Sequence, residues 1–313
     1  MIRAALIGLG TGILLAPLAL PCAAQQVTTS DSAFSWRGSI RQGAWLRIHD
    51  AKGDVRVMAA EGNEAEVRAV VRNRGERDDE ISFELITEGD DVIICAYPKD
   101  EGSCDADGVH RESRYSDRRT PSADFTVLLP RGVKIRANSG NGDVMVTNAG
   151  AEVDAASGNG EVHVTSAAGR VFAASGNGEV SVDDATGPVR ASSGNGRVRV
   201  TTATGPVNAS SGNGSIDVRM TRLGGEGDME FHTGNGTITV TVPADFEGEL
   251  DTNTGNGRVT TDFSLTVSGR IQPNRIRGTI GRGGRKVRMT SGNGNLELRR
   301  AGAGGAVNER GSD

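Results

Sequence analysis

Two cysteines are the residues of this chain best suited to covalent chemistry. Cys95 and Cys104 lie close together in the sequence, whereas Cys22, the third cysteine, belongs to the N-terminal segment. A redox-active or metal-binding pair is the less favoured interpretation, because the spacing is not C-x-x-C and no histidine cluster accompanies it. We expect a Cys95–Cys104 disulfide if the chain is exported to an oxidising compartment.

Three carboxylates recur at one position of successive repeats. Asp143, Glu161 and Glu179 follow one another at a constant interval, and carboxylates stacked in equivalent positions repel one another unless a positive charge relieves the repulsion. The sequence leaves two alternatives open. The row could bind a cation, or it could be a solvated acidic stripe partly neutralised by Arg190 and Arg197.

Signatures of catalysis are missing from the sequence. No G-x-S-x-G, H-E-x-x-H or P-loop pattern occurs, and the glycine-rich turns open no helix that could bind an anion. The histidines have no metal-ligand spacing: His49, His110, His163 and His232. We therefore predict no enzyme activity, no cofactor and no metal. A carbohydrate-active β-helix enzyme remains an alternative, although such enzymes usually carry longer loops than these repeats provide.

The element that must position these side chains is a repeat marked by Gly-Asn-Gly. Glycine accounts for 45 of the 313 residues, about twice its usual share. The first five tripeptides follow one another at one fixed interval, the next two intervals are slightly longer, and the last is about twice as long. A fixed period of this kind is the signature of a repeat architecture. The turn asparagines are Asn141, Asn159, Asn177, Asn195, Asn213, Asn235, Asn256 and Asn293.

Alternating aliphatic residues flank each turn. Around Asn177, Val171 and Ala173 precede the turn, and Val180 and Val182 follow it. The residues between them are polar in most repeats, so each repeat is expected to supply two short strands with one buried and one solvated face. A serine or threonine precedes every Gly-Asn-Gly.

These observations predict an all-β fold, a single-stranded β-solenoid with coils of about 18 residues and two short strands per coil. A stack of hairpins is the alternative, because Asn-Gly is also a hairpin signal. In-register recurrence of residue types favours the solenoid, in which the asparagines would form a hydrogen-bonded ladder. We expect the flanking glycines to permit positive φ angles and close backbone approach.

The remaining segments complete the predicted organisation. Residues 1–24 resemble a signal peptide, with Arg3 before an apolar run and small residues at its end. Residues 25–132 form an N-terminal β region with a degenerate coil and the Cys95–Cys104 loop, residues 133–300 form the solenoid, and residues 301–313 form a disordered tail. No later stretch is long and apolar enough to cross a membrane, so we expect no transmembrane segment in the mature chain.

The N-terminal β region holds several strand candidates, and two further segments depart from the regular repeat. Leu46, Ile48, Val55 and Val57 show the offsets of a degenerate first coil. Residues 105–120 are expected to form an exposed loop, and Ile276–Gly281 to fill the long interval before the last Gly-Asn-Gly as an irregular coil. The other strand candidates are Val67–Val71, Ile81–Ile86, Val92–Cys95 and Phe125–Leu129.

The repeated Ser-Gly-Asn-Gly-x-Val-x-Val unit resembles the DUF4097 family of bacterial proteins, often described as candidate adhesins. The stretch Phe125-Thr-Val-Leu-Leu-Pro-Arg-Gly-Val and the ending that starts at Arg277-Gly-Thr-Ile-Gly are similar to that family as well. The resemblance covers about residues 34 to 300. It implies a β-solenoid of the envelope or cell surface, with no catalytic residues to carry over and with the asparagines as structural turn residues only.

Taken with the resemblance, the sequence predicts an exported, non-enzymatic protein of the periplasm or cell surface that acts as an adhesin-like binding or scaffold surface. The expected partner is an envelope or extracellular protein or polysaccharide, and not nucleic acid. The basic residues near the C-terminus, such as Arg299 and Arg300, are expected to protect the last coil from edge-to-edge pairing. The first alternative is a bactofilin-like filament scaffold that associates end to end.

Overall fold

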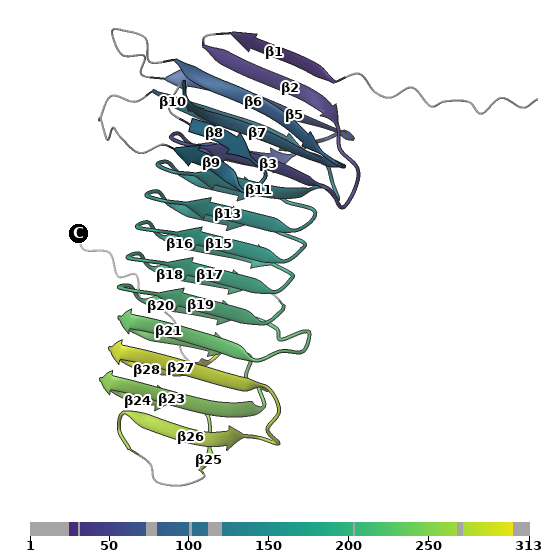
Figure 1. Ribbon diagram of the computed structural model, residues 1–313. Coiled ribbons are helices and arrows are strands. Elements are labelled where there is room, and N and C mark those ends of the chain that lie inside the picture. The colour runs from purple at the N-terminus through teal and green to yellow at the C-terminus, as the bar shows by residue number, and fades with distance from the viewer. Residues whose placement is uncertain are drawn as a thin grey trace, which may run out of the picture.

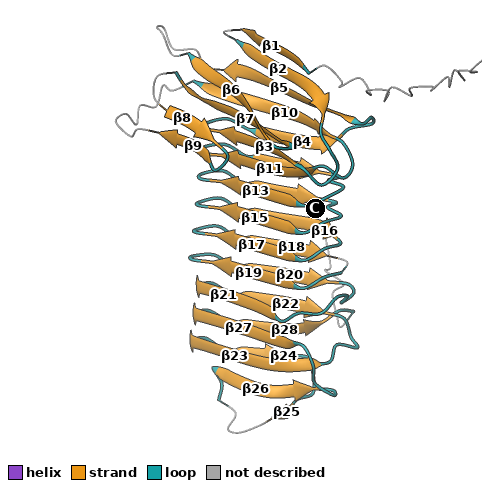
Figure 2. Ribbon diagram, turned by 45° about the vertical axis from the view of Figure 1, so that its right-hand side comes forward, coloured by secondary structure: helices purple, strands orange, loops and turns teal. Residues whose placement is uncertain are grey.

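The alternation of aliphatic and polar residues produces strands throughout the described part of the chain. The computed structural model describes residues 25–30, 32–72, 80–99, 102–111, 121–202, 204–267 and 272–302. These residues form two 13-stranded sheets and one two-stranded hairpin. Figures 1 and 2 show the two sheets as a rod of stacked coils. The predicted β-solenoid is confirmed. The predicted signal peptide and residues 303–313 of the tail lie outside the described residues.

Each regular coil contributes one strand to each sheet. Strands β11 and β13 pair in parallel, with Ile135 opposite Val153 and Ala137 opposite Ala155. The stacked-hairpin alternative is therefore wrong, because each strand pairs with its counterpart in the neighbouring coil. The strands of the regular coils are β11 (Lys134–Ser139), β12 (Val144–Thr147), β13 (Val153–Ser157), β14 (Val162–Thr165), β15 (Val171–Ser175), β16 (Val180–Ala185), β17 (Val189–Ser193), β18 (Val198–Thr202), β19 (Val207–Ser211), β20 (Ile216–Met220), β21 (Met229–Asn235) and β22 (Ile238–Val242).

Valine and alanine fill the narrow space between the sheets. Val162, Val180 and Val198 are fully buried, as are Ala155 and Ala173. The two sheets of a coil lie so close together that most coils have no room for aromatic side chains, which explains the low aromatic content. One hydrophobic core runs along the rod from the N-terminal strands to Leu298. The domain boundaries proposed from the sequence stay a prediction.

The hydroxyl before each Gly-Asn-Gly turn joins neighbouring coils. Ser175 Oγ donates to the Gly160 carbonyl at 2.7 Å and accepts the Gly178 N–H at 2.8 Å. The same donor bond links Ser157 to Gly142 at 2.8 Å. Because these hydroxyls are buried, each bond satisfies backbone groups that water cannot reach.

Close approach, and not backbone conformation, requires glycine in most of these turns. A Cβ added to Gly178 would lie 2.1 Å from the Gly160 carbonyl oxygen, and one added to Gly176 would lie 2.3 Å from the Gly158 oxygen. Among the glycines of the Gly-Asn-Gly turns, only Gly236 and Gly294 have positive φ angles. The expectation of positive φ is therefore wrong for the regular turns. Their backbone remains in ordinary regions while the coils stack too closely for a side chain.

The coil order departs from the sequence order near the N-terminus. The degenerate coil predicted around Leu46 exists as β3 (Trp45–Asp50) and β4 (Val55–Ala59). It lies between the β11–β12 coil and a coil made by β7 (Asp91–Pro98) and β10 (Ser122–Leu129), which comes later in the chain. Strands β1 (Gln26–Ser30), β2 (Ala33–Ser39), β5 (Glu64–Arg72) and β6 (Ile81–Glu88) extend the two sheets in antiparallel pairing.

The coil order departs from the sequence order at the opposite end as well. Strands β27 (Lys286–Asn293) and β28 (Leu296–Arg300) lie between the β21–β22 coil and the earlier coil made by β23 (Gly248–Asn256) and β24 (Val259–Thr261). The predicted irregular coil at Ile276–Gly281 is wrong. Strand β26 (Arg275–Ile280) instead pairs antiparallel with β23 and with β25 (Thr266–Val267). Strands β25 and β26 therefore cover the outer edge of β23, and the last coil, β27–β28, stacks on the other side of β23 and β24.

A hairpin replaces part of the predicted loop at residues 105–120. Strands β8 (Gly102–Asp105) and β9 (Gly108–Arg111) pair antiparallel. The turn signal Asp105-Ala-Asp-Gly108 explains this hairpin, since Asp105 Oδ1 accepts the N–H groups of Asp107 and Gly108 at 2.8 and 3.2 Å. Residues 112–120 lie outside the described part of the chain.

Candidate functional site

The turn asparagines form one continuous ladder along an edge of the rod. Seven Nδ2–H···Oδ1 bonds of 2.6 to 2.8 Å join the eight side chains. The order runs from Asn141 to Asn235 in sequence and then continues through Asn293 to Asn256. Each interior side chain donates to one neighbour and accepts from the other. The ladder thus uses its carbonyl groups to hold coils together and offers little to a ligand.

The structure joins Cys95 and Cys104, as the sequence predicts, with a Cα–Cα distance of 6.3 Å. The disulfide ties the β8–β9 hairpin to strand β7 in sheet B, the sheet that contains β11 and β13. Cys95 lies in register with His49. The disulfide therefore holds the β8–β9 hairpin beside the buried His49 side chain.

His49 and its neighbours line a small polar cavity beside the hairpin. The cavity has a volume of about 370 Å³ and is also lined by Asp50, Asp107 and Asn138. His49 Nδ1 is 3.3 Å from Asn138 Nδ2, which requires the ring nitrogen to accept. Burial, followed by the charges of nearby arginines, lowers the pKa of His49 to about 4. The imidazole is therefore neutral at pH 7.

Asp50 occupies the position that Ser139 holds in the neighbouring coil. Burial is the main cause that raises the pKa of this carboxyl well above its usual value. Asp50 Oδ1 accepts the N–H of Lys52 at 3.2 Å. Because burial disfavours ionisation of this carboxyl group, we assign Asp50 to packing between coils and not to acid–base chemistry.

The acidic row bonds to the backbone. Asp143 Oδ1 accepts the N–H of Glu161 at 2.8 Å, and Asp54 Oδ1 accepts the N–H of Asp143 at 3.1 Å. His163 Nε2 lies 2.9 Å from Glu161 Oε2. Among the described residues, no group of three or more His, Cys, Asp and Glu side chains could hold a metal ion. These contacts favour the acidic stripe over a cation site.

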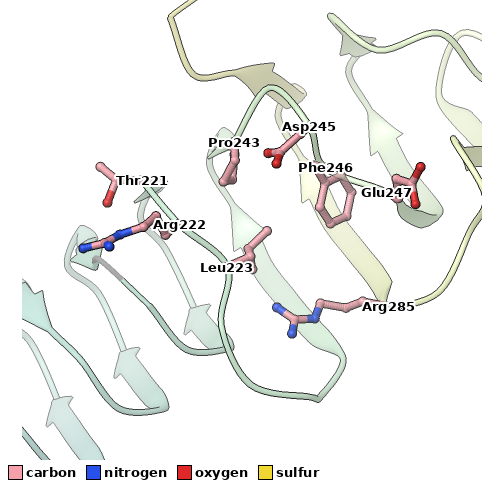
Figure 3. A pocket seen from close by; sticks show the side chains of 8 residues that line it. All are labelled: Thr221, Arg222, Leu223, Pro243, Asp245, Phe246, Glu247 and Arg285. Carbon is pink, nitrogen blue, oxygen red and sulfur yellow. The ribbon is translucent and has the colours of Figure 1, made fainter.

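A hollow of about 590 Å³ opens where the last coil enters the stack (Figure 3). Leu223, Pro243 and Phe246 provide its apolar lining, while Arg222, Asp245, Glu247 and Arg285 bring charge. The segment after β20 supplies Leu223, and the segment after β22 supplies Phe246.

Arg285 binds the segment between β20 and β21 beside this hollow. Its Nη2 donates to the carbonyl groups of Gly224 and Gly225. The backbone N–H of Lys286 donates to Asp228 Oδ1 at 3.0 Å. The long segment between β20 and β21 is thus held by the coil that inserts next to it, and the two together shape the hollow.

A second hollow, of about 400 Å³, lies on the outer face of sheet B over β17, β19 and β21. Its polar lining consists of Arg190, Asn208, Ser210, Glu230 and His232. Parallel pairing between β19 and β21 starts only at Ala209 and Phe231. Asn208 Oδ1 instead accepts the Glu230 N–H at 2.9 Å.

Sequence reasoning missed both hollows, although a signal for them exists. The interval between Asn213 and Asn235 is longer than the intervals between the preceding turn asparagines. This longer interval marks the coil at which pairing between β19 and β21 starts late and the loop between β20 and β21 is longer. Coils with the regular interval have neither feature.

One protein family matches most of the chain. The family described as Toastrack DUF4097 matches residues 44–299. No curated protein matches the chain. No helix among the described residues is long and apolar enough to cross a membrane.

Three solved structures of low sequence identity align with most of the chain. A candidate adhesin from Bacteroides fragilis is 8% identical with a TM-score of 0.44, and the alignment covers 87% of this chain and 98% of the other. A candidate adhesin from Parabacteroides merdae is 10% identical with a TM-score of 0.33, covering 88% and 99%. A candidate cell adhesion protein from Clostridium sporogenes is 10% identical with a TM-score of 0.30, covering 85% and 98%.

Proposed function

Because the chain belongs to the Toastrack DUF4097 family, we propose that it is an exported, non-enzymatic β-solenoid with an adhesin-like binding surface in the cell envelope. The ligand would be a protein or polysaccharide of the envelope or of the extracellular surroundings. The proposed location is the periplasm or the cell surface.

The observation that carries this proposal is the contrast between the two faces of each strand. Inward positions repeat nearly the same valines and alanines, which are fully buried. Outward positions do not repeat: Phe172, Arg190, Asn208 and Glu230 occupy one column in successive coils. The core is built from the inward residues, so the outward strand positions can vary and are available for recognition. The two hollows near β21 are concave sites in which a ligand could bind.

A filament scaffold is less well supported by the ends of the rod. End-to-end stacking would need open parallel edges, whereas sheet B ends in antiparallel pairs at both ends, β25–β26 and β6–β7. Light scattering of the mature chain at high concentration tests this alternative. A monodisperse species the length of one rod would exclude it, and concentration-dependent fibres would favour it over the binding surface.

Saturable binding tests the proposed function. Immobilised mature chain, residues 25–313, is titrated with fractionated envelope proteins, envelope polysaccharides and extracellular matrix proteins. We expect saturable binding to one of these classes that heat-unfolded chain does not show. If no fraction binds saturably, the proposed function is wrong. Export is tested separately by fusing residues 1–24 to a reporter enzyme that is active only outside the cytoplasm, with Arg3 and the apolar run intact.

A further inference from the structure

We propose that the outer face of sheet B binds an uncharged oligosaccharide along the column from Phe172 to Glu230. This inference rests on the proposed function and specifies its ligand class and binding site.

Phe172 is the one large hydrophobic side chain exposed on the described regular coils, with 37% of its surface accessible. On the same face, Asp154 and Arg190 lie opposite Phe172 in the adjacent coils, whereas the next outward row along the strands is small. Ala174 lies two residues further along the strand, and Ala156 and Ser192 lie opposite Ala174 in the adjacent coils. The small side chains on that side of the ring leave room for a flat partner above the sheet. An exposed aromatic ring has an energetic cost in water that a stacking ligand would remove.

Polar groups continue the column beyond the ring. Phe172 is in register with Arg190, and Arg190 is in register with Asn208. The Glu230 N–H then bonds to Asn208 Oδ1 at 2.9 Å. With a spacing of about 4.8 Å between coils, the column from Phe172 to Glu230 extends over about 14 Å. This length suits an oligosaccharide better than a single sugar.

The charged groups in this part of the column lack the ion pairs seen elsewhere in it. Arg136 pairs with Asp154 at 2.7 Å, and Arg277 pairs with Asp251 at 2.8 Å. Neither Arg190 nor Glu230 lies in an ion pair with any described residue, although Arg288 is in register with Glu230. The Arg190 guanidinium, the Asn208 Nδ2 and the Glu230 carboxylate thus remain available as donors and acceptors in the hollow of about 400 Å³.

This combination of groups selects the ligand class. The C–H face of a sugar ring stacks on an aromatic ring, while neighbouring hydroxyls both donate and accept, as guanidinium and carboxylate groups require. Charges of both signs occur in the column, so a polyanionic glycan would meet Glu230 and Asp154 as well as Arg190. A protein partner would call for several apolar or aromatic anchors, and Phe172 is the one exposed large hydrophobic side chain on the described regular coils. The chemistry therefore points to a neutral oligosaccharide.

Binding of defined glycans tests the inference. An array of neutral and acidic oligosaccharides identifies a ligand, and titration calorimetry gives its dissociation constant for the wild type and for variants. We expect Phe172→Ala and Phe172→Leu to weaken binding about tenfold and Phe172→Trp to retain it. Arg190→Ala should weaken binding by a similar factor. Arg199→Ala is the matched control, because Arg199 is an exposed arginine without an ion pair on the opposite sheet.

The outcomes separate this inference from the proposed function. Unchanged affinity in Phe172→Leu and Arg190→Ala would overturn the site, as would equal losses in Arg199→Ala. Salt-sensitive binding of acidic glycans alone, or saturable binding of an envelope protein with no glycan bound, would overturn the ligand class while the proposed function stands. Circular dichroism melting shows that each variant is folded, and Phe172→Leu keeps apolar bulk in the strand if Phe172→Ala does not fold.

Discussion

Removing one asparagine from the ladder should weaken the stack by an amount that depends on its place in the row. Asn177 donates to Asn159 at 2.6 Å and accepts from Asn195 at 2.7 Å, so Asn177→Ala deletes two hydrogen bonds. A hydrogen bond contributes about 0.5–1.5 kcal/mol net. The ladder is exposed, so water can satisfy the groups left behind. We therefore expect the free energy of unfolding to fall by about 1–2 kcal/mol.

Two further variants provide stability losses with which the loss in Asn177→Ala can be compared. Asn256 is a terminal member of the ladder with a single bond, to Asn293 at 2.7 Å, and Asn256→Ala should cost about half as much as Asn177→Ala. Asn253→Ala is the control, since Asn253 is an exposed strand asparagine outside the ladder and its removal should change stability by less than about 0.5 kcal/mol.

Urea denaturation followed by circular dichroism measures these differences. Because repeat proteins unfold in segments and not always as one unit, hydrogen exchange of the turn amides around each substituted site provides a second, local measurement. Equal stability of Asn177→Ala and Asn253→Ala would refute the argument that side-chain bonds between coils stabilise the rod. Equal losses in the interior and terminal variants would refute the count of bonds.

Three further perturbations follow from the structure. Gly178→Ala would place a Cβ 2.1 Å from a carbonyl oxygen of the preceding coil and should lower the free energy of unfolding by about 3 kcal/mol or more. Gly62→Ala is the control, because Gly62 has open space around it, and it should be nearly neutral. Similar urea midpoints for the two variants would contradict the stacking constraint. Burial lowers the pKa of His49 to about 4, so the unfolded chain takes up the proton first and the unfolding free energy should drop by about 3 kcal/mol as the pH falls from about 6.5 to about 4. His49→Gln should reduce this dependence in melts across that pH range, and an unchanged slope would count against it. A chain without residues 285–313 should lose protease protection of residues 248–280, because the coil between β21 and β23 is gone; continued protection would show that these strands can close the gap.

Much of the repeat unit could be predicted from the sequence because its requirements are local to one coil. The valines and alanines of Val171–Ser175 recur at equivalent positions, and each strand face follows from alternation alone. The role of the glycines was only half predictable. Their spacing shows that they are needed, but the reason, a carbonyl of the preceding coil where a Cβ would lie, exists only once Gly178 and Gly160 are stacked.

The functional surface was less predictable than the core. Asn208 and Glu230 belong to different repeats and meet because pairing between β19 and β21 starts late. Nothing in the local sequence of either residue shows this contact. The cavity beside His49 likewise depends on the β8–β9 hairpin, which the disulfide places on the outer face of sheet B.

The sequence by itself determined the coil: two short strands, a buried column of small aliphatic residues, a hydroxyl and an asparagine turn. Only the tertiary structure decided which coils are neighbours. Residues 286–300 stack between two coils that come earlier in the chain, and Trp45–Ala59 stack between two coils that come later. The physical reason is that nearly equivalent coils offer one another nearly the same parallel ladder and the same core, so local pattern cannot rank the pairings. Connection lengths, the antiparallel end strands and contacts such as Arg285 to the segment after β20 select the order, and with it the hollows on the surface.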